Sequence, residues 1–130
     1  MDVLASCSRI KWLYGFIGLA VLINFSGLGI TIMSPDAALY ASIAKNLVVN
    51  NDFVSLTSEG RDWLDKPHFP FWVTAISFKL FGINTWAYKM PAILLMMMGA
   101  VYTYKFAKDL YYKEIGLWAV LILLTAQHII

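Results

Sequence analysis

A lysine and two aspartates in this sequence have types and settings that could do chemistry. Lys66 is followed directly by Pro67, and a lysine ammonium is a compact point charge suited to binding a phosphate. Because the proline ring restricts the backbone, the direction of Lys66 is locally fixed. Asp36 follows a Ser-Pro corner, where its carboxylate could act as a general base toward a hydroxyl within hydrogen-bond reach. These residues predict a phosphate-binding lysine and a catalytic carboxylate.

Asp65, the second aspartate, has a less defined chemistry. It could bind a divalent metal or orient the site, but only His68 lies nearby as a second ligand, which is too few for a metal centre. A local ion pair with Lys66 is an equally good interpretation. For Asp36, the alternative is a carboxylate that only stabilises a helix start through the helix dipole. Tyr40 and His68, close to these residues in the sequence, are candidates for lining the site.

The composition of the chain is that of an integral membrane protein. Of its 130 residues, 60% are hydrophobic and 14% are charged, whereas soluble domains have about 25% charged residues. The mean hydropathy is +0.67. A formal net charge of +2 is too small to indicate a nucleic-acid partner, which requires a basic surface. The single cysteine, Cys7, excludes an internal disulfide and a cysteine metal cluster.

Three apolar stretches are predicted to cross the membrane. The first, residues 12–33, would form a helix of about 33 Å, enough for a hydrocarbon core of about 30 Å. The second covers about residues 86–106, and the third covers residues 115–130. Arg9 and Lys11 precede the first span, so the positive-inside rule places the N-terminus in the cytoplasm.

Residues 34–85 form a predicted external loop that contains helices lying along the membrane surface. A Ser-Pro-Asp sequence fits the cap and first turn of an amphipathic helix that continues to about Asn50. Its apolar stripe recurs at every fourth position, at Leu39, Ile43 and Leu47. Asp36 falls outside that stripe. Residues 53–61 are a polar loop, and a second helix over about residues 71–81 is too short to span.

The connection between the second and third spans is rich in lysine. If the helix over residues 71–81 lies flat, this connection returns to the cytoplasm, as the positive-inside rule prefers. The long loop then lies on the external, periplasmic side. Gln127 and His128 lie near the outer end of the third span, where an interface location costs less than a polar cavity inside the membrane.

Four short motifs follow one another along the chain. They run from Ser34 to Ala44, from Trp63 to Trp72, from Leu80 to Asn84, and over Lys89-Met90-Pro91. Their order and spacing resemble the start of a bacterial polytopic glycosyltransferase of the family that includes protein O-mannosyltransferases and the aminoarabinose transferases of lipid A. The resemblance covers nearly the whole chain but only the N-terminal part of the family members, which carry many more spans and a C-terminal region.

The resemblance implies an enzyme with a GT-C type fold that takes a sugar from a polyprenyl-phosphate carrier. It maps the essential acid after the first span onto Asp36, the lysine that contacts the carrier phosphate onto Lys66, and an acid near a metal in some members onto Asp65. Family members commonly have Glu where this chain has Ala37, a second Pro where it has His68, and Arg-Leu-Pro in place of the last motif. Because this Glu is missing, the resemblance does not fix the type of acceptor.

Together these features predict an all-α integral membrane segment of the bacterial inner membrane, residues 1–130 forming the N-terminal part of a glycosyltransferase. Its partners would be a polyprenyl-phosphate sugar donor, membrane lipids, and a lipid, glycan or protein acceptor. No cofactor is predicted apart from the divalent metal left open at Asp65. We expect this segment to be inactive alone, because part of the site is missing. Two alternatives stay open: a small non-enzymatic membrane subunit, and a fragment of a transporter for lipid-linked sugars.

Overall fold

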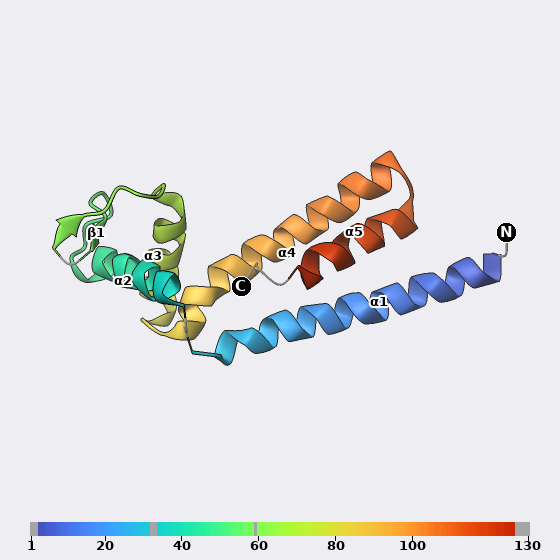
Figure 1. Cartoon of the computed structure of the whole chain (residues 1–130), viewed down its shortest axis with the longest axis horizontal. Coiled ribbons are helices and arrows are strands. Elements are labelled where there is room, and N and C mark those ends of the chain that lie inside the picture. The colour runs from blue at the N-terminus through green and yellow to red at the C-terminus, as the bar shows by residue number, and fades with distance from the viewer. Residues whose placement is uncertain (1–2, 32–33, 59, 127–130) are drawn as a thin grey trace. The chain divides into compact units, whose positions relative to one another are not determined.

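The computed structural model describes residues 3–31, 34–58 and 60–126 of the chain. Figure 1 shows a mostly helical chain with one short hairpin. The elements follow in the order α1 (Val3–Ser26), η1 (Gly27–Gly29), α2 (Pro35–Val49), β1 (Thr57–Ser58), β2 (Arg61–Asp62), α3 (Phe69–Phe81), α4 (Thr85–Leu110) and α5 (Lys113–Thr125). Two compact units are present: Leu28–Pro91 is one, and Met1–Gly27 with Ala92–Ile130 is the other.

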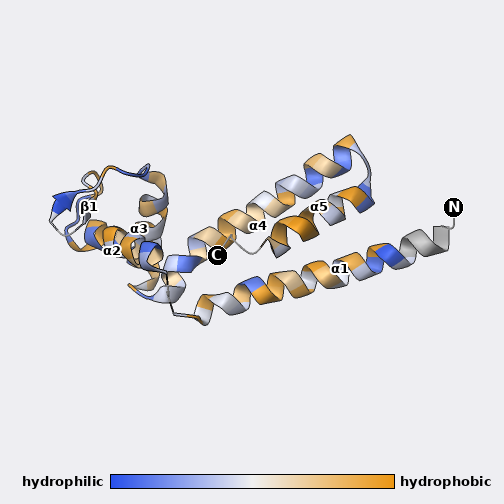
Figure 2. Cartoon of the chain, in the orientation of Figure 1, coloured by the Kyte–Doolittle hydropathy of each residue, from blue (hydrophilic) through white to orange (hydrophobic). Residues whose placement is uncertain are grey.

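The first candidate membrane span is α1 with the short 3-10 turn η1 that extends it. Its apolar part of spanning length is Ser8–Gly29, 22 residues, whereas the sequence predicted residues 12–33. The helix begins earlier because residues 3–11 continue it without a break. It ends earlier because Gly27 and Gly29 have low helix propensity. Figure 2 shows the apolar residues that follow a polar segment near the start of α1.

The second candidate span is α4, which has 26 residues and confirms the helix predicted over residues 86–106. Pro91 lies inside this helix near its start. A proline lacks the N–H that would bond to the carbonyl of Ala87 in the preceding turn. The hydroxyl of Ser77, a buried residue of α3, donates to this Ala87 carbonyl at 2.6 Å. The side chain from α3 thus replaces the missing backbone bond and ties the two helices together.

The third predicted span coincides in part with α5. This helix begins at Lys113 and has 13 residues, so its described part is shorter than a bilayer requires. Gln127 and His128 lie outside the described residues. In the part of the chain that the structure describes, two helices are long and apolar enough to cross a membrane, and the third span stays a prediction.

In the unit formed by residues 1–27 and 92–130, α1 packs against α5. Aliphatic side chains and one methionine fill this core, at Ala20, Met96, Ala100, Val120 and Leu124. The amide of Asn24 donates to the Leu124 carbonyl at 3.0 Å and to the Ala20 carbonyl at 2.8 Å. Toward the other end, Arg9 lies 3.6 Å from Glu114. Polar contacts therefore hold the two helices together at both ends of their shared surface.

In the unit Leu28–Pro91, α2 packs against α3 over a core of aliphatic and aromatic side chains. This core consists of Ile43, Leu47, Leu56, Phe71 and Ala75, and a smaller cluster beside it consists of Ala44, Phe78 and Ala87. The C-cap of α3 is Gly82, whose φ is 82° and whose N–H donates to Phe78 at 2.9 Å. Glycine adopts this left-handed backbone without strain. α3 coincides with the short second helix predicted from the sequence, but it has 13 residues and begins at Phe69. Its location along the membrane surface stays a prediction.

Two details of this unit differ from the sequence-based expectation. The predicted all-α chain contains a small antiparallel hairpin, in which Thr57 pairs with Asp62 and Ser58 with Arg61. Gly60 in its turn has a φ of 76°, the left-handed conformation that such a turn requires. The helix α3 also includes Pro70, which the sequence placed before the helix. A proline in the first turn costs no helical hydrogen bond, because those N–H groups have no partner within the helix.

Candidate functional site

Asp36 lies in the first turn of α2. Ser34 is the N-cap in an extended backbone conformation, and Pro35 occupies the first turn, as the sequence predicted. The Ser34 carbonyl accepts the first helical bond, from Ala38 at 3.0 Å. The Asp36 carboxylate is exposed, and the N-terminal end of a helix dipole favours its negative charge. The carboxylate is therefore available to a ligand from solvent.

The position of Asp36 on α2 differs from the sequence-based assignment. Residues 36, 40, 43 and 47 have the three- and four-residue spacing that places side chains along one face of a helix. On this face Ile43 is 0% exposed and Leu47 is 1% exposed. Asp36 is thus the exposed end of the stripe that packs against α3, and the sequence-based assignment outside the stripe was wrong.

Three aromatic rings connect α2, the loop before α3, and α3 itself. The Tyr40 ring lies 5.8 Å from the Trp63 ring and 5.8 Å from the Phe71 ring, measured between centroids. Trp63 and Phe71 meet edge to face at 5.4 Å. Because aromatic pairs of this geometry attract one another, the three rings fix the loop against the helix that carries Asp36. Tyr40 therefore acts as a packing residue here.

Asp65 and Lys66 lie in the loop that follows Trp63, and both side chains are exposed. Within residues 3–31, 34–58 and 60–126, the only ion pair joins Arg9 to Glu114. In the same ranges neither Asp65 nor Lys66 forms a hydrogen bond or a ring contact. The local ion pair between them, one of the alternatives from the sequence, is not formed. The side chain of Lys66 is therefore open to a ligand from solvent.

His68 is occupied in holding the neighbouring loop. Its Nε2 lies 3.0 Å from the carbonyl oxygen of Val54, and a carbonyl only accepts, so Nε2 carries the proton. The Trp72 indole N–H donates to the Phe53 carbonyl at 2.7 Å, and the His68 and Trp72 rings lie 5.7 Å apart. These two side chains fasten residues 53–54 to the start of α3.

Sequence reasoning missed how this loop is organised. The Asp52 carboxylate accepts from the N–H of Val54 at 2.9 Å and from the N–H of Ser55 at 3.2 Å. The hydrogen bond from Val54 and those from the hydroxyl and the N–H of Ser55 hold the pKa of Asp52 below its ordinary value of 3.8. An aspartate in an Asn-Asn-Asp sequence is the signal for such a turn.

The structure does not supply a complete metal site around Asp65. Among the residues that it describes, no three histidine, cysteine, aspartate or glutamate side chains gather closely enough to hold a metal ion. Divalent cations such as Mg²⁺ and Ca²⁺ require several oxygen ligands. A metal role for Asp65 therefore stays a prediction.

The comparisons with known proteins point to one family. The model of the family described as dolichyl-phosphate-mannose-protein mannosyltransferase matches residues 65–130, half of the chain. An uncharacterized protein of Aquifex aeolicus (strain VF5) is 29% identical over 89 residues, which cover 68% of this chain and 18% of that protein.

Two further relatives carry a functional name. The undecaprenyl phosphate-alpha-4-amino-4-deoxy-L-arabinose arabinosyl transferases of Pseudomonas paraeruginosa (strain DSM 24068 / PA7) and Pseudomonas aeruginosa (strain LESB58) are each 27% identical over 94 residues, which cover 72% of this chain and 17% of each transferase. The chain spans less than a fifth of the length of these curated relatives. No solved structure matches the chain.

The family match begins at Asp65, directly before Lys66, and extends through α4. It agrees with the resemblance of the four motifs, two of which lie wholly in the matched part. The chain therefore belongs to the dolichyl-phosphate-mannose-protein mannosyltransferase family, whose members are glycosyltransferases of the GT-C type.

Proposed function

We propose that this chain provides part of the catalytic site of a glycosyltransferase that moves a sugar from a polyprenyl-phosphate carrier to a lipid, glycan or protein acceptor. The names of the family and of the Pseudomonas relatives refer to dolichyl phosphate and undecaprenyl phosphate, which are both polyprenyl phosphates. The shared chemistry is a phosphate linked to a long apolar chain. Such a carrier suits a chain with apolar helices of spanning length.

One observation carries this proposal: the ring cluster of Tyr40, Trp63 and Phe71 packs the helix that begins with Asp36 against the segment that leads to Lys66. Tyr40 lies one helical turn after Asp36, and Trp63 lies shortly before Lys66. A site for glycosyl transfer from a phosphate carrier needs its charged groups held in place by packed neighbours. The cluster supplies that support, while the carboxylate and the ammonium remain exposed to a ligand.

The proposed reaction is displacement at the anomeric carbon of the carrier-linked sugar. Asp36 accepts the proton of the acceptor hydroxyl as its oxygen forms the new bond to this carbon. The bond from the anomeric carbon to the phosphate oxygen breaks, and its electron pair leaves with the polyprenyl phosphate. Lys66 stabilises the negative charge that develops on this phosphate. Asp65 orients the lysine or the carrier.

The same proposal places the loop with these residues on the external side of the bacterial inner membrane. Arg9 and Lys11 precede the first span, and the positive-inside rule puts this end in the cytoplasm. Residues 34–85 then emerge on the opposite face, with α2 and α3 along the membrane surface. The variant Cys7→Ser with Leu64→Cys, whose only thiol is at an exposed position, tests this: a membrane-impermeant maleimide should label it in intact cells. Labelling only after cell lysis would contradict the orientation.

The transfer experiment uses residues 1–130 joined to the remainder of the Pseudomonas aeruginosa relative in place of its matching N-terminal segment. With a labelled undecaprenyl-phosphate sugar as donor, we expect transfer to a lipid acceptor by the joined protein and none by residues 1–130 alone. Lys66→Ala should abolish transfer. Lys108 is an exposed lysine at the end of α4, and the control variant Lys108→Ala should retain transfer. Carrier flux across vesicles without transfer would favour the transporter instead, and a joined protein with native fold but no transfer would contradict the proposal.

A further inference from the structure

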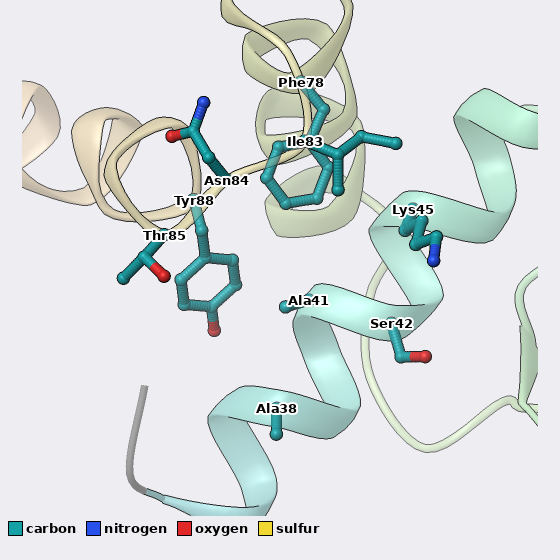
Figure 3. A pocket seen from close by; sticks show the side chains of 9 residues that line it. All are labelled: Ala38, Ala41, Ser42, Lys45, Phe78, Ile83, Asn84, Thr85 and Tyr88. Atoms are coloured by element: carbon teal, nitrogen blue, oxygen red, sulfur yellow. The ribbon is translucent and has the colours of Figure 1, made fainter. Parts of the chain in front are cut away.

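A cavity lies on the flank of α2, away from Asp36. Figure 3 shows it lined by side chains of α2, of α3 and of the start of α4, and its volume is about 300 Å³. The lining residues used here are Ala38, Ser42, Lys45, Phe78, Thr85 and Tyr88. Lys45 follows Asp36 by nine residues, about 900° of helical rotation, so the two side chains leave α2 on opposite sides. The cavity is therefore separate from the candidate catalytic face.

The cavity combines an apolar floor with a polar rim. Phe78 is 3% exposed, and its ring lies 6.5 Å from that of Tyr88, so the floor is packed and preformed. Small residues of α2, Ala38 among them, leave the space open. The hydroxyls of Ser42 and Thr85 and the ammonium of Lys45 belong to the same lining (Figure 3). This mixture fits a ligand that is part apolar and part anionic.

Lys45 is the charged group of this rim. Its side chain is exposed, and within residues 3–31, 34–58 and 60–126 it forms no ion pair, hydrogen bond or ring contact. Asn84 also lines the cavity, but its amide donates to the carbonyls of Phe81 and Gly82, and its oxygen accepts from the N–H of Ala87. Asn84 therefore shapes the helix start, while Lys45 is left to neutralise an anion.

The location indicates where such a ligand comes from. Thr85 is the first residue of α4, a candidate membrane span, and the end of a span lies at the level of lipid headgroups. Beside it, the Trp86 and Phe81 rings meet edge to face at 5.1 Å, and both are partly exposed. Tryptophan is enriched at this depth of the bilayer. The cavity therefore opens where phospholipid headgroups are concentrated.

We propose that this cavity binds one anionic phospholipid. Its phosphate lies against Lys45 and the hydroxyl of Ser42, which leave α2 on the same side of the cavity (Figure 3), and its glycerol and first acyl carbons lie over Ala38 and Phe78. A single lysine near an anionic membrane surface contributes about a five-fold preference for the anionic lipid. This lipid is additional to the carrier assigned to Lys66 and does not depend on that assignment. It would hold α2 to the membrane beside the start of α4.

The test measures lipid retained by the purified 130-residue chain, by native mass spectrometry in mixed micelles of phosphatidylglycerol and phosphatidylcholine. We expect preferential retention of one phosphatidylglycerol. Lys45→Ala should lower this preference about five-fold, and Lys45→Arg should keep it. Ala38→Phe, a change at an exposed position, should fill the cavity and remove both lipids. Lys108→Ala is the matched control and should retain phosphatidylglycerol as the unchanged chain does. Helix content by circular dichroism checks the fold of each variant.

Three results would overturn the phospholipid assignment. If Lys45→Ala and Lys108→Ala lose the preference for phosphatidylglycerol equally, the lipid is held by unspecific attraction between charges. Displacement of phosphatidylglycerol by inorganic phosphate would show a site for the free anion. Displacement by equimolar undecaprenyl phosphate would assign the cavity to the carrier. Because Lys66→Ala should leave phosphatidylglycerol retention unchanged, failure of this proposal is distinguishable from failure of the proposed glycosyl transfer.

Discussion

The hydroxyl of Ser77 in α3 donates a 2.6 Å hydrogen bond to the carbonyl of Ala87 in α4. This carbonyl lacks its usual helical partner because Pro91 has no N–H. Ser77 is 6% exposed, so water has little access to replace the bond. The proline in the last of the four motifs and the serine in α3 therefore work together, and they hold the first turns of α4 against α3 within the unit Leu28–Pro91.

Replacing Ser77 by alanine should destabilise the fold. The variant leaves the Ala87 carbonyl buried without a partner, which costs about 1–3 kcal/mol. Thermal unfolding in detergent, followed by circular dichroism, measures this loss. Threonine at the same position keeps a hydroxyl and should lose less.

The companion variant Pro91→Ala tests whether Ser77 stabilises the fold by replacing the missing backbone hydrogen bond. An alanine restores the N–H at position 91, which can bond to the Ala87 carbonyl. In this background Ser77→Ala should cost less than about 1 kcal/mol, because the carbonyl keeps a partner. Equal costs of Ser77→Ala in both backgrounds would mean that the serine acts through packing alone.

The elements of this chain were largely predictable because local rules govern them. The Ser34-Pro35 start of α2 and the Gly82 end of α3 follow from capping and turn preferences. The first span was misplaced by several residues, since apolar composition does not report where Gly27 ends a helix. The boundaries of an element depend on such single residues, whereas the average composition of a stretch does not show where they lie.

The organisation of the candidate site was less predictable because it depends on contacts between distant residues. The sequence singled out Asp36 and Lys66, yet the ring cluster that joins their segments combines Tyr40, Trp63 and Phe71 from three places in the chain. No local spacing encodes that arrangement. The stripe containing Asp36 could have been found, since a mixed spacing of three and four describes a helix face better than a spacing of four.

Removing the ring of Trp63 should loosen the loop that carries Lys66. Trp63→Ala deletes two of the three ring pairs and opens a partly buried space, so we expect a loss of about 2–4 kcal/mol. Trp12→Ala is the matched control, because Trp12 is 68% exposed and should cost about 0.5 kcal/mol or less. Protease cleavage in residues 60–68 should become faster in Trp63→Ala only. Similar cleavage rates in both variants would argue against the cluster as the support of the loop.

The stability of the loop after α2 should depend on acid pH through Asp52. Its pKa in the folded protein lies below the ordinary value, chiefly because the Val54 N–H binds the carboxylate. The stabilisation is therefore fully present above about pH 4 and is lost as the pH falls through the folded-state pKa. Amide exchange at Val54 and Ser55 should report this loss. In Asp52→Asn, the amides of Val54 and Ser55 should exchange faster at neutral pH, and acidification should change their exchange little. If this variant keeps the acid-dependent change, another group causes it.

Asp36 is expected to affect transfer without affecting carrier binding. In the protein joined to the Pseudomonas remainder, Asp36→Asn should lower the transfer rate by about 10²–10⁴-fold, the usual contribution of a general base. Binding of undecaprenyl phosphate should stay within about two-fold, because the carboxylate acts on the acceptor hydroxyl. The exposed position of Asp36 makes misfolding of this variant a minor concern. A transfer rate near that of the unchanged protein would remove the catalytic assignment.

The interaction of Lys66 with the carrier phosphate is tested most directly by equilibrium binding of undecaprenyl phosphate to the joined protein in nanodiscs, with undecaprenol as the uncharged control ligand. Lys66→Ala should weaken undecaprenyl-phosphate binding about 10–100-fold, the loss of one hydrogen bond to a charged group. Lys66→Arg should recover part of the affinity, Lys108→Ala should change nothing, and undecaprenol should bind all forms alike. Equal affinity of the unchanged protein and Lys66→Ala for undecaprenyl phosphate would contradict the carrier-phosphate site.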